Sequence, residues 1–213
     1  MKKIFLTILL IFSSLLATAQ YKYRDSNRIG IIFGVNQFQL NSTNFNTKPA
    51  MGWNAGLSMR GNFYNDWDMV YAMQFSESNF TVETRNLFLA NEDVNYKLAA
   101  AQVSLMLSYK VVENHLSLEF GPVVQVNGKL AIDKEEENNI INGTTLMAKD
   151  ITDISKFNFY PAVGITAGIK HLRLNVQYQY GVNNILGNLN KQGFGPDFKG
   201  NAGILSGNLI VYL

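Results

Sequence analysis

The chain has 213 residues, of which 47% are apolar and only 16% are charged, with no cysteine and a formal net charge of +2. Soluble domains carry about 25% charged residues, so this chain is short of charge, although its mean hydropathy is near zero. The abundant apolar and aromatic residues exclude intrinsic disorder, and the missing cysteines exclude disulfides and zinc–thiolate sites. The small net charge argues against nucleic-acid binding.

Residues 1–19 have the pattern of a cleaved signal peptide. A basic start is followed by an apolar run from Ile4 to Ala17, which is shorter than the ~20 residues of a spanning helix. Ala17-Thr18-Ala19 supplies the small-x-small cleavage pattern, which leaves Gln20 as the new N-terminus. The two lysines of this segment account for the whole net charge. We expect residues 20–213 to form a single exported domain without net charge.

Eight later segments alternate between apolar and polar residues with period two, which is typical of strands that have one apolar face. In the clearest of them, Trp53, Leu57 and Phe63 share one face and Asn54, Ser58 and Arg60 share the other. The expected strands cover residues 28–38, 52–63, 67–76, 102–109, 116–126, 157–170, 172–181 and 201–213.

The connections between these segments alternate in length. Residues 64–66, 110–115 and 170–171 form tight turns, whereas 39–51, 77–95, 127–156 and 183–199 are long and polar. An even number of strands with this alternation predicts an all-β fold, an eight-stranded antiparallel up-and-down transmembrane β-barrel with short periplasmic turns and long outer loops. Closure requires the first strand to pair with the last.

A soluble lipocalin-like barrel would show the same alternation with its apolar face turned inward. The polar faces are poor in charge for a water-exposed surface, and the apolar faces carry none, as contact with lipid requires. Bulky aromatic residues also fall near the strand ends, as in interfacial girdles. The girdle residues are Trp53, Phe63, Trp67, Phe75, Tyr109, Phe157, Phe159 and Tyr180. These patterns favour the bacterial outer membrane.

Three segments carry short motifs of a known family: Leu118-Glu-Phe-Gly-Pro-Val-Val124, Tyr178-Gln-Tyr-Gly-Val-Asn-Asn-Ile185 and Gly30-Ile-Ile-Phe-Gly-Val-Asn36. All three resemble segments of the PorT-like outer-membrane β-barrel family of Bacteroidota. The resemblance implies a barrel, and a few members of that family belong to secretion and gliding machinery. The last nine residues, 205–213, are similar to the C-terminal signal read by the barrel-insertion machinery, although this chain ends in Leu213 rather than an aromatic residue.

No catalytic constellation is evident. The two histidines, His115 and His171, fall in the expected periplasmic turns, and Ser117 near His115 has no acidic orienting partner in the sequence. Arg60, Glu119 and Arg173 point into the expected lumen, where they could form a gate or a proton path, or an internal ion-pair cluster; we favour the cluster. The acidic run 133–137 lacks the spacing of a calcium loop, so we expect no metal and no cofactor.

The sequence therefore predicts a non-enzymatic outer-membrane barrel with a narrow lumen filled by side chains. Its expected partners are outer-membrane lipid, the barrel-insertion machinery during assembly, and a protein of the cell surface or of a secretion complex. Two alternatives stay open: a secreted lipocalin-like barrel that binds an apolar ligand, and an outer-membrane lipid-modifying enzyme that uses His115 or a loop serine.

Overall fold

The computed structural model describes residues 27–86, 88, 90–194 and 197–213; the expected signal peptide lies outside these residues. The chain forms strands and two 3-10 helices, η1 (Ala148–Thr152) and η2 (Leu189–Lys191). The strands are β1 (Arg28–Ser42), β2 (Thr47–Tyr64), β3 (Trp67–Arg85), β4 (Asn91–Val112), β5 (Leu116–Ala131), β6 (Ile140–Ile141), β7 (Phe157–Gly168), β8 (Leu172–Tyr180) and β9 (Gly200–Tyr212). None of the helices described is both long and apolar enough to cross a membrane.

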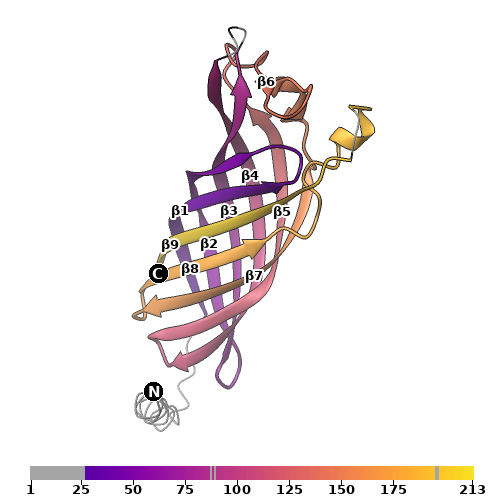
Figure 1. The fold of residues 1–213 in the computed structure, drawn as a ribbon. Coiled ribbons are helices and arrows are strands. Elements are labelled where there is room, and N and C mark those ends of the chain that lie inside the picture. The colour runs from indigo at the N-terminus through magenta and orange to yellow at the C-terminus, as the bar shows by residue number, and fades with distance from the viewer. Residues whose placement is uncertain (1–26, 87, 89, 195–196) are drawn as a thin grey trace, which may run out of the picture.

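Eight of these strands form a closed antiparallel ring, which confirms the predicted barrel (Figure 1). Each strand pairs with the next one along the chain, except that β5 pairs with β7, and β6 adds only a short pairing to the end of β3. The ring closes between β1 and β9, from Gly30 opposite Tyr212 to Ser42 opposite Gly200. Closure gives both outer edges a hydrogen-bonded partner, as a chain in lipid requires.

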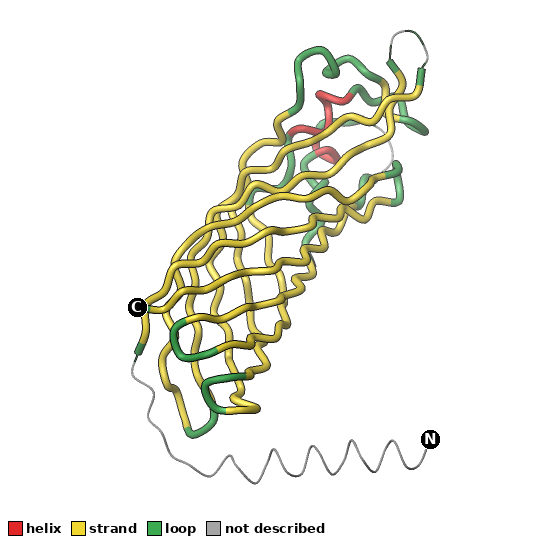
Figure 2. Tube along the Cα trace, turned by 90° about the vertical axis from the view of Figure 1, so that its left-hand side faces the viewer, coloured by secondary structure: helices red, strands yellow, loops and turns green. Residues whose placement is uncertain are grey.

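The connections at one end of the barrel are tight turns, and the connections at the other end are loops that contain both 3-10 helices (Figure 2). Asn65 and Asn114 lie in two of the tight turns with φ angles of 47° and 59°. Asparagine tolerates this left-handed conformation better than most residues. We call the two ends of the barrel the short-turn end and the loop end.

Two of the predicted long loops are largely strand, so their predicted bounds are wrong. Residues 39–51 and 77–95 mostly extend the strands, which leaves connections of only 43–46 and 86–90. The third, 127–156, loses its start to β5 and contains β6 and η1, neither of which the sequence predicted. Only the fourth, between β8 and β9, is close to its expected length.

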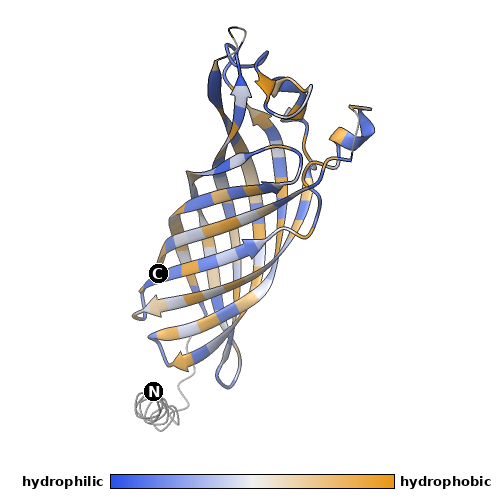
Figure 3. Ribbon diagram, viewed as in Figure 1, coloured by the Kyte–Doolittle hydropathy of each residue, from blue (hydrophilic) through white to orange (hydrophobic). Residues whose placement is uncertain are grey.

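The polarity of the two strand faces inverts where the strands approach the loop end. Hydrophobic and hydrophilic residues alternate along the strands of the barrel (Figure 3). On β3 the outward residues are apolar as far as Phe75 and then become polar with Glu77, Asn79 and Thr81. The inward residues change in the opposite sense, from Ser76 and Ser78 to the buried Phe80 and Val82. The barrel therefore continues beyond its apolar belt into a region with a polar exterior and an apolar core.

The orientation of the faces within the belt excludes the lipocalin-like alternative. Leu57 and Leu174 remain 56% and 63% exposed on the outside, whereas Asn54 and Gln177 are buried inside. A water-soluble barrel would place these side chains the other way round. The outer surface of the belt is therefore suited to lipid.

Candidate functional site

The lumen is the candidate site, because the barrel directs most of its buried polar groups into it. Arg60 on β2, Glu119 on β5 and Arg173 on β8 all point inward near the short-turn end, and each is at most 5% exposed. On each strand these residues occupy the same alternate positions as the other buried, inward-facing side chains. The structure brings Arg60 and Glu119 into contact, but it leaves Arg173 outside that contact.

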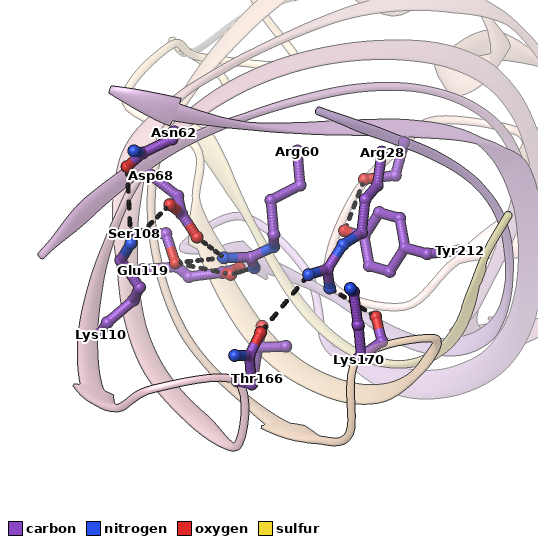
Figure 4. Close-up of polar contacts among 12 residues, drawn as sticks. Arg28, Arg60, Asn62, Asp68, Ser108, Lys110, Glu119, Thr166, Lys170 and Tyr212 are labelled. Carbon is purple, nitrogen blue, oxygen red and sulfur yellow. Dashed lines mark hydrogen bonds and ion pairs between the residues drawn. The ribbon is translucent and has the colours of Figure 1, made fainter. Parts of the chain in front are cut away.

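Arg60 is the centre of a buried ion network (Figure 4). Its Nη1 donates to Asp68 Oδ2 at 3.1 Å and to Ser108 Oγ at 2.8 Å, and its Nη2 donates to Glu119 Oε1. Lys110 Nζ lies 3.2 Å from the other oxygen of Asp68. One guanidinium thus links two carboxylates from different strands.

Asp68 and Lys110 are members of this network that the sequence analysis did not include. Asp68 carried a usable signal, because it lies on the polar face of its predicted strand. Lys110 was expected in a turn, but β4 continues to Val112 and directs the lysine inward. Lys110 joins the network because β4 is longer than predicted, so that the lysine lies within the strand and not in a turn.

A layer of amide side chains occupies the middle of the lumen. Asn54 Nδ2 donates to Gln74 Oε1 and to Asn208 Oδ1, both at 2.7 Å. Asn208 in turn donates to Asn175, whose Nδ2 donates to Glu119 Oε2 at 3.2 Å, so the amides connect to the ion network. A cavity lined by Asn54 and Gln74 has a volume of about 10 Å³, which is about the space that one water requires.

An apolar plug fills the lumen at the loop end. The rings of Phe38 and Phe80 lie 5.5 Å apart, and Phe80 stacks on Tyr96 at 5.3 Å. The Tyr96 hydroxyl donates to the carbonyl of Ala148 in η1 at 2.8 Å, which attaches the β5–β7 loop to the plug. The loops add further buried apolar side chains to this core: Leu146, Ile151, Ile154, Ile185, Leu186 and Leu189.

The structure places the aromatic residues that we assigned to girdles at two levels of the outer surface. Near the short turns, Phe63 is exposed and Trp67 packs on Tyr109 and Phe120 with centroid distances of 5.0 and 5.9 Å. The others lie towards the loop end and are each more than 40% exposed: Trp53, Phe75, Phe157, Phe159 and Tyr180. Their contact with the lipid interface stays a prediction.

The loop end carries two polar crevices, both of which are lined in part by Glu92 on β4. Lys48 bridges Asp93 at 2.8 Å and Glu83 at 3.3 Å, and these bonds raise the pKa of the lysine. This crevice has a volume of about 400 Å³. A second, of about 320 Å³, lies beside Phe88 and the acidic residues of the β5–β7 loop.

The two histidines lie in the short turns, and each has a ring nitrogen near a backbone carbonyl. His115 Nδ1 lies 2.8 Å from the carbonyl of Glu113, and His171 Nδ1 lies 3.2 Å from the carbonyl of Tyr212. Within the residues that the structure describes, neither ring bonds to a carboxylate. The same residues contain no group of three or more acidic, histidine or cysteine side chains that could hold a metal ion.

Comparisons with known proteins support this architecture. Residues 18–187 match the family model described as "Outer membrane protein beta-barrel domain". No curated protein matches the sequence. Among solved structures, neisserial surface protein A (NspA) aligns over 88% of this chain and 99% of its own, with 13% identity and a TM-score of 0.51. Ail of Yersinia pestis, solved in complex with the heparin analogue sucrose octasulfate, aligns over 89% and 100%, with 12% identity and a TM-score of 0.52.

Proposed function

Since the chain belongs to the outer membrane protein beta-barrel domain family and lies in the bacterial outer membrane, we propose that it is a closed, non-enzymatic barrel that presents its loop end to protein partners. The observation that carries this proposal is the filling of the lumen. An ion network, an amide layer and an apolar plug follow one another along the barrel axis. An eight-stranded barrel is just wide enough to be filled in this way.

The loop end is the part of the molecule available for partner contact. The belt is apolar and suited to lipid, and the short turns contain few residues, whereas the loop end has polar strand faces, two crevices and the 90% exposed Phe88. The resemblance to PorT-like proteins suggests a secretion complex as the setting. The polar loop end would equally suit contact with a protein at the cell surface.

Electrical recording tests whether the lumen is closed. The purified barrel in planar lipid membranes should give no steady ion conductance, while gramicidin added to the same membrane shows that single channels would be detected. A stable open channel formed by the wild-type protein would contradict the proposed closed lumen.

A further inference from the structure

Three lysines lie on the outer surface just beyond the apolar belt, on the side of the loop end. Lys97 is on β4, Lys129 is on β5 and Lys156 directly precedes β7, and all three are exposed. The three strands follow one another in the ring, in the order β4, β5, β7. The lysines therefore belong to one sector of the outer surface, which we call the lysine sector.

Each lysine lies where its strand leaves the belt. On β5 and β7 the last large apolar outward residues are Val126 and Phe157, which are register partners. Lys156 immediately precedes Phe157, and Lys129 follows Val126 by three residues. On β4, Lys97 is the first charged outward residue beyond two outward alanines. The lysine sector thus lies at the boundary between the apolar and the polar surface.

A β-bulge accounts for the outward position of Lys129. The register between β4 and β5 shifts between Leu98 and Ala100, where Gly128 and Lys129 together oppose a single residue. Strict alternation from the buried, inward Asn127 would turn Lys129 inward as well. The extra residue of the bulge changes the phase of the alternation, so the lysine is exposed.

The charges of the lysine sector are not neutralised by neighbouring carboxylates. Among the residues that the structure describes, its three ammonium groups form no hydrogen bond and no ion pair. On the adjoining strand β3, Glu77 lies opposite Ala99 and supplies one carboxylate. Asp153, in the loop before β7, accepts instead from the amides of Asn188 and Gln192. The sector therefore keeps a net positive charge.

We propose that the lysine sector binds the phosphate groups of anionic lipid headgroups in the leaflet at the loop end. Lysines at a membrane surface attract anionic lipids. The belt next to the lysines presents large apolar side chains that are each more than 40% exposed: Val124, Val126, Phe157 and Phe159. A lipid whose chains lie on these side chains brings its phosphate to the level of the ammonium groups. This contact with lipid is separate from the protein contact proposed for the loops.

Lipid titration followed by native mass spectrometry tests the proposal. The purified barrel in maltoside detergent is titrated with dioleoyl phosphatidic acid, whose headgroup is a bare phosphate, and separately with the zwitterionic dioleoyl phosphatidylcholine. The lysine-sector variant combines three substitutions at exposed positions: Lys97→Gln, Lys129→Gln and Lys156→Gln. The matched control removes the same charge from exposed lysines of the loops: Lys134→Gln, Lys191→Gln and Lys199→Gln. Circular dichroism verifies that both variants are folded.

The wild type should bind phosphatidic acid in preference to phosphatidylcholine, and the lysine-sector variant should bind phosphatidic acid about tenfold more weakly. The loop-lysine control should match the wild type. Glycerol 3-phosphate at the same concentration should not displace the lipid, because the lipid chains also contact the belt. The proposal would be overturned if the wild type showed no preference, if the lysine-sector variant kept the wild-type affinity, if the control lost as much affinity, or if glycerol 3-phosphate displaced the lipid.

Discussion

Arg60 is the residue on which the buried charges of the lumen converge. It links Asp68 on β3 to Glu119 on β5, and so it couples strands that are not adjacent in the ring. A buried ion pair contributes little compared with a well-packed apolar pair, but removing one partner leaves the other as an uncompensated buried charge. The network therefore makes the barrel sensitive to the loss of any single member.

Glu119→Ala should lower the free energy of unfolding by about 3–5 kcal/mol, because Arg60 then loses a charge partner in a buried site. Urea unfolding of the refolded barrel in lipid vesicles measures this change. The matched control is Asp66→Ala at an exposed turn position, which should stay within about 0.5 kcal/mol of the wild type. Equal stability of the two variants would contradict the network, and neither should conduct ions.

For single residues, the sequence predicts which side chains point inward. The alternation of side chains along a strand is enough to predict this orientation for Arg60, Glu119 and Arg173. It does not predict which of them meet. Contact depends on the register between strands and on the shear of the barrel, and these placed Arg60 against Glu119 while Arg173 faces Gly168.

At the scale of the element, the strands are longer than the belt that crosses the membrane. Beyond Phe75 the outward residues of β3 are polar. A strand prediction that requires apolar residues on the outward face therefore ends there and assigns 77–95 to a loop. The period of two nevertheless continues, with Phe80 and Val82 on the other face. The boundary of the apolar belt was predictable from the sequence, but the end of the strand was not.

Tyr96→Phe should loosen the β5–β7 loop, because the buried carbonyl of Ala148 then loses a donor. A buried acceptor left without its bond costs about 1–3 kcal/mol. Limited proteolysis with trypsin should therefore cut after the exposed Lys149 about tenfold faster than in the wild type. Tyr71→Phe on the outer face, where the hydroxyl makes no hydrogen bond to a described residue, is the control, and equal rates for the two variants would refute the anchoring role.

The same loop should be docked more firmly at acidic pH. Burial and the neighbouring carboxylates Asp133, Glu92 and Glu135 raise the pKa of Glu136 above its ordinary value. The docked loop thus holds this proton more tightly than the undocked loop, so docking is strongest below the ordinary glutamate pKa of about 4.3 and weakens as the pH rises through the raised pKa.

A spin label on Thr145→Cys, in a chain that has no other cysteine, reports this effect. Label mobility in the electron paramagnetic resonance spectrum should increase as the pH rises from about 4 towards 7. Glu136→Gln should flatten the curve. Mobility that falls over this range, or an unchanged curve in Glu136→Gln, would show that Glu136 does not control docking.

At the scale of the whole molecule, the fold follows from the requirement that a chain in lipid satisfy all of its backbone hydrogen bonds. The eight segments with period-two alternation predicted the number of barrel strands, the alternation of connection lengths predicted the up-and-down order, and the requirement for closure predicted the pairing of β1 with β9. The layering of the lumen could not be predicted in the same way. It depends on side chains from many strands that meet only after closure, such as Phe80 with Tyr96.

Trypsin treatment of intact cells tests most directly that the loop end of this outer-membrane barrel faces outward. Lys134 lies exposed in a turn of the β5–β7 loop, and Lys170 lies exposed in a short turn at the opposite end. We predict cleavage after Lys134 in intact cells and cleavage after Lys170 only once the cells are lysed, as identified by mass spectrometry of the fragments. Cleavage after Lys170 in intact cells, with Lys134 spared, would contradict the account.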